Sequence, residues 1–199
     1  MAASDFIYVN IRDYLSADCE ASKPLLEATL KNYACPLNPD VEHFLKHNAV
    51  DFARRNQSVT YLVFAATDGA LVGYFTIALK AITVNAATLS NTVRKRFARL
   101  SDLDAASNAY TLPAFLIAQI GKNYADRLNE RITGSALPHM TWNVITELQY
   151  AAGGVVAFLE AEDNAKLLQF YIHENNFRQF SVRQSSTQGK TLIQLLKPL

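Results

Sequence analysis

The spacing of apolar residues in the first quarter of the chain predicts one strand followed by two helices. Residues 6–11 alternate between apolar and polar side chains, as expected of a strand. Residues 23–33 carry apolar side chains at helical spacing, and Asp40 is a suitable cap for a second helix. The face of that second helix that we expect to be buried consists of Val41, Phe44, Leu45, Asn48 and Phe52.

The pattern then changes to the period of β-strands. Residues 59–66 and 70–79 are rich in β-branched and aromatic side chains, and Asp68-Gly69 between them is typical of a tight hairpin turn. Residues 113–120 form a nearly continuous apolar run, which predicts a strand buried on both faces. The polar stretch that separates these strands contains a basic helical piece at residues 92–100.

The last third of the chain alternates between helices and strands. A long helix is expected from Gly134 to Ala152, since Pro138 is tolerated near the first turn and Gly153-Gly154 ends the helix. The remaining predicted elements are a buried strand at 155–159, a helix at 163–174 beginning at Asp163, and a closing hairpin of 177–182 with 192–196. This order predicts one mixed α/β domain over residues 1–199.

Size and composition narrow the class of protein. A chain of 199 residues fits one domain, and a net charge of +1 gives no general attraction to nucleic acid or membranes. No run approaches the roughly 20 apolar residues that a membrane span needs, so we expect no membrane association. Cys19 and Cys35 form no metal-ligand pattern. With no secretion signal at the N-terminus, we expect reduced thiols and a cytoplasmic location.

A strand followed by a polar loop and a helix is the first candidate for chemistry. The first turn of a helix offers unpaired N–H groups and a positive dipole end, which suit a pyrophosphate. Gly134 allows close approach of the backbone, Ser135 offers a hydroxyl group, and Arg131 adds a cation beside them. The alternative is that the same residues simply cap the helix.

Two further places could carry function. Asn164 and Tyr171 are seven residues apart, hence on one face of a helix, and a phenol there could donate a proton to a leaving thiolate. The alternative is a core tyrosine below a capping asparagine. The basic piece could contact phosphates or could be a solvated helix face; its cations are Arg94, Lys95, Arg96 and Arg99. His43 and His47 have zinc-compatible spacing but lack a third ligand, so we expect no metal site.

Together these motifs resemble the GNAT acetyltransferases. Asn164 through Phe170-Tyr171 to Phe177 resembles the last GNAT motif, and Ile120-Gly121-Lys122 to Gly134-Ser135 resembles the fourth strand, pyrophosphate loop and following helix. Residues 60–82 are similar to the central hairpin of the family. In the loop the sequence departs from the family pattern, because Ile132 stands where a glycine is usual and only Gly134 is kept.

The resemblance implies a twisted mixed sheet whose fourth and fifth strands splay apart around acetyl-CoA. The thioester would lie against the backbone of Ile120, Gly121 and Lys122. The coenzyme would also be held at Arg131, Thr133, Gly134, Ser135 and Asn164. An acceptor amine would attack directly, Tyr171 would protonate the departing coenzyme A, and no residue is assigned as the base.

Three hypotheses for the function follow. In the leading hypothesis the acceptor is a primary amine of a small molecule or peptide. Residues 33–45 and 59–61 also resemble the N-terminal region of toxin-type GNAT enzymes, which acetylate the amino group of aminoacyl-tRNA, although a net charge of +1 leads us to expect weak tRNA binding. The third is a degenerate GNAT domain that binds or scaffolds without catalysis. A sheet edge could also pair two copies into a homodimer.

Overall fold

A mixed sheet runs through the chain. The computed structural model describes residues 5–16, 22–184 and 189–199, and within these the sheet has seven strands in the order β1-β2-β3-β4-β5-β7-β6. β4 pairs with β5 in parallel, and β1–β2, β2–β3, β5–β7 and β6–β7 pair antiparallel. The strands are β1 Phe6–Asn10, β2 Val59–Ala65, β3 Leu71–Asn85, β4 Ala109–Lys122, β5 Val156–Glu162, β6 Arg178–Gln184 and β7 Thr191–Pro198.

Helices of three kinds connect the strands. The α-helices are α1 Ile11–Ser16, α2 Ser22–Lys31, α3 Pro39–His43, α4 Ala49–Arg54, α5 Asn91–Phe97, α6 Ala136–Ala152 and α7 Ala165–Leu168. Two π-helical turns, η1 Phe44–Asn48 and η4 Gln169–Glu174, and two 3₁₀ segments, η2 Ala86–Thr88 and η3 Ala125–Arg131, complete the elements. The predicted mixed α/β class is therefore confirmed, while the splaying of the fourth and fifth strands stays a prediction.

The chain forms two compact units, and three elements run through both. The first unit comprises residues 1–78 and 118–144, and the second comprises residues 79–117 and 145–199. β3, β4 and α6 each begin in one unit and end in the other. The single domain expected from the sequence stays a prediction.

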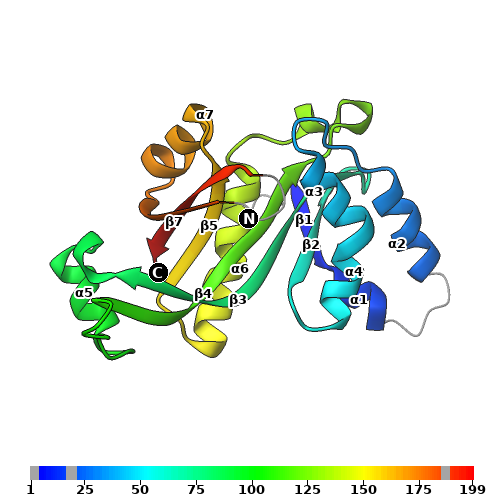
Figure 1. Cartoon of the computed structure of the whole chain (residues 1–199). Coiled ribbons are helices and arrows are strands. Elements are labelled where there is room, and N and C mark those ends of the chain that lie inside the picture. Colours follow the sequence, from blue (N-terminus) through cyan, green and yellow to red (C-terminus); the bar gives the residue numbers. More distant parts are fainter. Residues whose placement is uncertain (1–4, 17–21, 185–188) are drawn as a thin grey trace. The chain divides into compact units, whose positions relative to one another are not determined.

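In the first unit, helices α1, α2 and α4 pack with strands β1 and β2 (Figure 1). Apolar side chains of these elements share one core, which includes Ile11, Leu26, Leu45 and Leu62. The predicted hairpin between residues 59–66 and 70–79 is present as β2 and β3. Gly69 in its turn has a positive φ of 71°, and Asp68 accepts a hydrogen bond from the backbone N–H of Ala70.

The helix predicted to begin at Asp40 differs from the prediction in its cap and its face. Its N-cap is Asn38, whose side chain accepts hydrogen bonds from the N–H groups of Asp40 and Val41. A π-helical turn then follows, and it underwinds the helix by placing more residues in one turn. The buried positions after it are accordingly Ala49 and Ala53, while the predicted Asn48 and Phe52 are only half-buried.

Two glycines allow the strands and helices of the first unit to approach closely. A Cβ atom at Gly73 of β3 would lie 2.8 Å from the carbonyl oxygen of Gly121 and 3.0 Å from Leu137 of α6. A Cβ atom at Gly121 of β4 would lie 2.5 Å from a methyl carbon of Val41 and 2.6 Å from the hydroxyl oxygen of Tyr33. The backbone of β4 at Gly121 is therefore packed closely against β3 on one side and against the side chains of Val41 and Tyr33 on the other.

In the second unit, the excursion between β3 and β4 is held by an aromatic anchor. Phe97 at the end of α5 is fully buried, and its ring packs edge-on against Tyr110 with centroids 6.2 Å apart. Ser90 caps α5, since its side chain accepts a hydrogen bond from the N–H of Val93. Figure 1 shows α5 and its connections beyond the ends of β3 and β4.

The prediction that residues 113–120 are buried on both faces is wrong. Leu112, Ala114 and Phe115 are buried, but Pro113 is exposed, and every residue of β4 from Leu116 to Lys122 is half-buried. A strand in the middle of a sheet normally has its apolar side chains covered. This half of β4 therefore has an open side, which matters for the site.

The C-terminal helices end and begin close to the predicted positions. Gly153 and Gly154 follow α6 with φ values of 78° and 120°, conformations that glycine adopts readily, and they end the helix as expected. The next helix begins one residue later than predicted. Asn164, not Asp163, is its N-cap, since the Asn164 side chain accepts from the N–H groups of Lys166 and Leu167.

We predict that substitution by alanine lowers stability at one glycine and does not lower it at another. Gly121→Ala forces a methyl group against Val41 and Tyr33 and should lower the free energy of unfolding by about 1–3 kcal/mol. Gly134→Ala meets nothing within 4 Å and should leave stability unchanged or raise it by up to about 1 kcal/mol. Denaturant unfolding of both variants measures the difference, and equal stability would refute the close packing at Gly121.

Candidate active site

The residues predicted to hold acetyl-CoA fall into two groups. Ile120, Gly121 and Lys122 end β4, and Arg131, Thr133, Gly134 and Ser135 lie at the end of η3 and before α6; all seven belong to the first unit. Asn164 and Tyr171 belong to the second unit, on α7 and η4.

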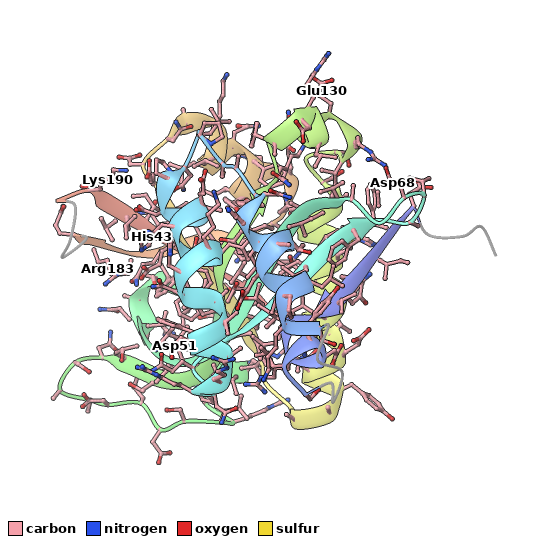
Figure 2. All side chains as sticks on the ribbon, turned by 90° about the vertical axis from the view of Figure 1, so that its right-hand side faces the viewer. His43, Asp51, Asp68, Glu130, Arg183 and Lys190 are labelled. Atoms are coloured by element: carbon pink, nitrogen blue, oxygen red, sulfur yellow. The ribbon has the colours of Figure 1, made fainter. Side chains whose placement is uncertain are left out.

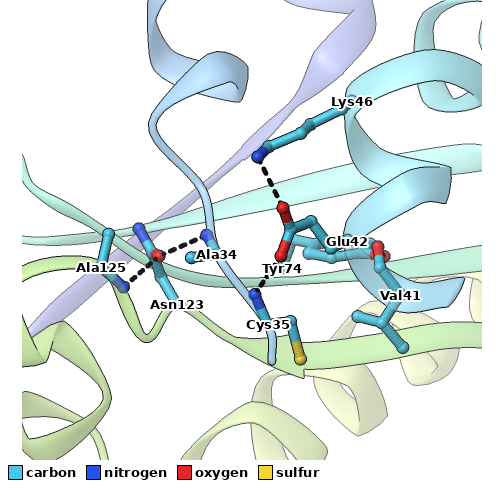
Figure 3. Close-up of polar contacts among 8 residues, drawn as sticks. All are labelled: Ala34, Cys35, Val41, Glu42, Lys46, Tyr74, Asn123 and Ala125. Atoms are coloured by element: carbon cyan, nitrogen blue, oxygen red, sulfur yellow. Dashed lines mark hydrogen bonds and ion pairs between the residues drawn. The ribbon is translucent and has the colours of Figure 1, made fainter. Parts of the chain in front are cut away.

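The loop after β4 is anchored by the buried side chain of Asn123, which no sequence motif singles out (Figure 3). Its amide oxygen accepts from the N–H groups of Ala34 and Ala125, both at 3.0 Å. Its amide nitrogen donates to the carbonyl oxygen of Leu71 at 2.8 Å. One side chain thus joins β3, the end of β4 and the linker between α2 and α3.

Lys122, the last residue of β4, binds the far end of the same loop. Its ammonium group donates hydrogen bonds to the carbonyl oxygens of Ile132 and Asn129. These two bonds tie residues 129–132 back to the last residue of β4. The Lys122 side chain therefore acts within the loop, and its backbone is the part that remains for a thioester.

Arg131 is engaged with the hairpin turn of the same unit. Its guanidinium group forms two hydrogen bonds of 2.9 Å with the carboxylate of Asp68 and one of 3.0 Å with Thr67. The Arg131 hydrogen bonds lower the pKa of Asp68 below its usual value. Figure 2 shows Asp68 at this turn and Glu130 on the loop that follows β4. Because Asp68 offsets its charge, Arg131 is a weaker phosphate ligand than its position in the sequence predicts.

The segment before α6 is open to a ligand. A Cβ atom at Gly134 would have no neighbour within 4 Å, and Thr133, Gly134 and Ser135 are all exposed. The carbonyl oxygen of Ser135 accepts from the N–H of His139, which makes Ser135 the cap position of the helix. Its hydroxyl group faces Thr133 at 3.3 Å, since Pro138 has no N–H for it to bind. The free N–H groups of the first turn, which form the positive end of the helix dipole, face this exposed segment.

Ile132 does not obstruct that segment, although it stands where a glycine is usual in GNAT loops. Its side chain is buried, with 2% of its surface exposed. Its backbone is extended, with φ −127° and ψ 131°, a conformation that requires no glycine. The left-handed residues of the loop lie earlier, at Asp126 and Arg127. The residues present are therefore compatible with a pyrophosphate at Thr133 to Ser135.

The side chain of Asn164 is occupied by helix capping. Its oxygen accepts from Lys166 and Leu167 at 3.0 and 3.3 Å. The seven-residue spacing to Tyr171 was expected to place both residues on one face of an α-helix. The chain instead changes to a π-helical turn after Leu168, so the spacing alone does not align them.

Tyr171 lies in an aromatic cluster. Its ring packs edge-on against Phe170 and Phe177, with centroids 5.2 and 5.9 Å away. Burial raises its pKa to about 12, so the hydroxyl group stays protonated at neutral pH. Among the residues that the structure describes, this hydroxyl group has no hydrogen-bond partner. It can therefore donate to a ligand, as well as serve as a core residue.

The other candidates are distinct from these groups. Lys95 on α5 and Arg99 in the turn after it are exposed, whereas Arg94 donates to the carbonyl oxygen of Ala86 at 2.8 Å. The rings of His43 and His47 lie 4.6 Å apart, and no group of three or more His, Cys, Asp or Glu residues suited to a metal ion occurs in the described part of the chain. Cys35 is a buried free thiol, and Cys19 lies outside the described residues. No helix in the described ranges could span a membrane.

Comparison with known proteins relates the chain to toxins by structure alone. No family model and no curated protein sequence matches it. AtaT complexed with acetyl-methionyl-tRNAfMet superposes with a TM-score of 0.64 and 18% identity, over 98% of this chain and 95% of AtaT. The second structure is a tyrosine-to-phenylalanine mutant of the toxin AtaT bound to the C-terminus of the antitoxin AtaR and acetyl-CoA. It gives a TM-score of 0.59 and 16% identity, over 98% of this chain and 93% of the mutant.

A third structure, a tyrosine-to-phenylalanine mutant of KacT, gives a TM-score of 0.62 and 17% identity, over 98% of this chain and 95% of KacT. Identities this low establish a shared fold. The mixed sheet with a parallel β4–β5 pair, flanked by helices, agrees with that fold. The chain therefore has the GNAT-like α/β fold of AtaT and KacT, as its resemblance to GNAT enzymes implied.

Proposed function

We propose that this chain is an acetyl-CoA-dependent N-acetyltransferase. The observation that carries the proposal is that the chain is accessible both at the end of β4 and before α6. The second half of β4 is half-buried, the segment at Gly134 is exposed, and a Cβ atom at Gly134 would meet nothing within 4 Å. A structure with this fold, that of the AtaT mutant, was determined with acetyl-CoA bound.

In the proposed reaction the acceptor amine attacks the thioester carbonyl directly. An N–C bond forms, the C–S bond breaks, the amine loses a proton and the thiolate gains one. The backbone of Ile120 to Lys122 would lie along the thioester, and the first-turn N–H groups of α6 would bind the pyrophosphate. The hydroxyl group of Tyr171 is protonated at neutral pH and would donate a hydrogen bond to the departing sulfur. Transfer of the proton requires the bound coenzyme to bring the phenol pKa, about 12, closer to the pKa of a thiol, about 8.5.

The second candidate acceptor is the amino group of aminoacyl-tRNA. It is supported by the similarity to AtaT, whose structure contains acetyl-methionyl-tRNAfMet. The exposed cations Lys95 on α5 and Arg99 in the following turn could contact phosphates. The third candidate is a catalytically degenerate domain, which a failure to bind acetyl-CoA would favour.

Gly134→Leu should weaken acetyl-CoA binding at least tenfold, which corresponds to about 1.4 kcal/mol. The substituted side chain would cover the N–H groups before α6, and because a Cβ atom at this position meets nothing within 4 Å, folding should not be affected. Isothermal titration measures the affinity, and Ala151→Leu at the exposed far end of α6 is the matched control. A wild-type protein that does not bind acetyl-CoA would rule out the proposed enzyme.

Tyr171→Phe should reduce turnover about a hundredfold and leave acetyl-CoA affinity nearly unchanged. The ring contacts with Phe170 and Phe177 are kept, so the melting temperature should not fall. Because the protonated form is the donor and its pKa is about 12, the wild-type rate should not decline through Tyr171 ionisation below pH 10. The exposed Tyr150→Phe is the control. An unchanged rate would return Tyr171 to a core role.

If aminoacyl-tRNA is the acceptor, tRNA affinity should fall steeply with salt, and Lys95→Ala with Arg99→Ala should reduce that slope by about 2. Arg127→Ala, whose side chain is paired with Glu130 at 3.0 Å, should leave the slope unchanged. Filter binding of charged tRNA over a salt series measures it. Weak binding that the double variant does not alter would favour a smaller amine.

A further inference from the structure

The last residue of β4 holds the main chain of the loop that precedes α6. The ammonium group of Lys122 donates hydrogen bonds to the carbonyl oxygens of Ile132 and Asn129. In the part of the chain that the structure describes, residues 129–133 make hydrogen bonds to strands and to the β2–β3 turn only through Lys122 and through the side chain of Arg131. The bonds of Arg131 hold a guanidinium group, whereas those of Lys122 hold the backbone itself.

Lys122 extends from a backbone position that does not depend on the loop. Gly121 on one side of it is closely packed, because a Cβ atom there would lie 2.6 Å from the hydroxyl oxygen of Tyr33. Asn123 on the other side is buried, and its side chain accepts hydrogen bonds from the N–H groups of Ala34 and Ala125 (Figure 3). The ammonium group of Lys122 therefore fixes the loop to a rigid strand end.

The hydrogen bond to Ile132 also sets the direction of the next N–H group. The described peptide bonds are trans, and in a trans peptide the C=O and N–H groups point in opposite directions. With its carbonyl oxygen bound to Lys122, the peptide between Ile132 and Thr133 directs the N–H of Thr133 away from Lys122. The side chain of Ile132 is buried, so packing holds the same residue from its other end.

That N–H is the first of three consecutive donors without a partner. No atom of the described residues accepts a hydrogen bond from the backbone N–H of Thr133, Gly134 or Ser135, and all three residues are exposed. Successive backbone N–H groups in a turn bind anions, and these lie next to the positive end of the α6 dipole. The direction of the first donor is thus set by a side chain 11 residues earlier in the sequence.

We infer that the side chain of Lys122 is a positioning residue for the pyrophosphate of acetyl-CoA. This inference rests on the proposed acetyltransferase function. Lys122 holds the peptide between Ile132 and Thr133 in the orientation that presents the Thr133 N–H to the phosphates, in a loop with isoleucine at this position. It acts through Ile132, because both of its acceptors are carbonyl oxygens of the loop.

The test compares acetyl-CoA with acetylpantetheine, which lacks the pyrophosphate and the nucleotide. Lys122→Met keeps the aliphatic stem and removes the donors, so isothermal titration should show acetyl-CoA binding about tenfold more weakly. The affinity for acetylpantetheine should be unchanged, and Lys122→Arg, which retains donors, should restore most of the affinity for acetyl-CoA. Lys46→Met is the matched control, because Lys46 is also half-buried in the first unit and pairs with Glu42 at 2.7 Å.

Two further measurements separate positioning from direct contact and from loss of folding. If Lys122 touched the phosphates, Lys122→Met would flatten the dependence of acetyl-CoA affinity on ionic strength, whereas a positioning residue leaves that dependence unchanged. Hydrogen exchange should show that saturating acetyl-CoA protects the N–H of Thr133 in the wild type and not in Lys122→Met. Lys122→Gln, which is shorter and uncharged, is the second variant and carries the same expectations.

The outcomes distinguish this inference from the proposed function. A selective loss of acetyl-CoA affinity in Lys122→Met supports the positioning role even if no amine is acetylated, and in that case the proposed function alone fails. Wild-type affinity for acetyl-CoA in the variant, an equal loss of affinity for acetylpantetheine, or a flatter salt dependence overturns the inference even if the protein acetylates an amine. A wild type that does not bind acetyl-CoA overturns both.

Discussion

The hydrogen bonds of Asn123 are the constraint on which the arrangement of the first unit depends. This side chain is 2% exposed, yet both of its polar atoms are bonded, to Ala34, Ala125 and Leu71. A buried amide left without partners would cost roughly 1–3 kcal/mol, so the three segments that satisfy it are held together. Its own backbone N–H also donates to Val72 at 2.9 Å. These hydrogen bonds therefore hold the end of β4 in position even where it is exposed to a ligand.

The strands and turns could be predicted from sequence because their signals are local. Gly69, Gly153 and Gly154 lie where the backbone has a positive φ, and the alternation of apolar residues located most strands. The helix caps were misplaced because asparagine and aspartate cap comparably well. At Asn38 the following Pro39 was the missed signal, since proline favours the first helical position. The π-helical turns had no such local signal, and they moved the buried face to Ala49 and Ala53.

The candidate site was predictable as a stretch of chain but not as a set of side-chain roles. The segment from Ile120 to Ser135 was located correctly as strand end, loop and helix start. The partner of Arg131 is 63 residues away, and no pattern along the chain indicates such a pair.

The charges of the predicted coenzyme segment act mainly within the protein. Lys122 binds two loop carbonyl groups, and Arg131 is paired with Asp68. With these cations engaged, a pyrophosphate at Thr133 to Ser135 would depend on backbone N–H groups and the dipole of α6. Pro138 removes one N–H from that first turn, so few donors remain. Backbone donors carry only partial charges, and their interaction with phosphate is therefore less sensitive to salt than an ion pair. Coenzyme binding should consequently depend weakly on ionic strength, in contrast to the binding of a phosphate backbone by the exposed side chains of Lys95 and Arg99.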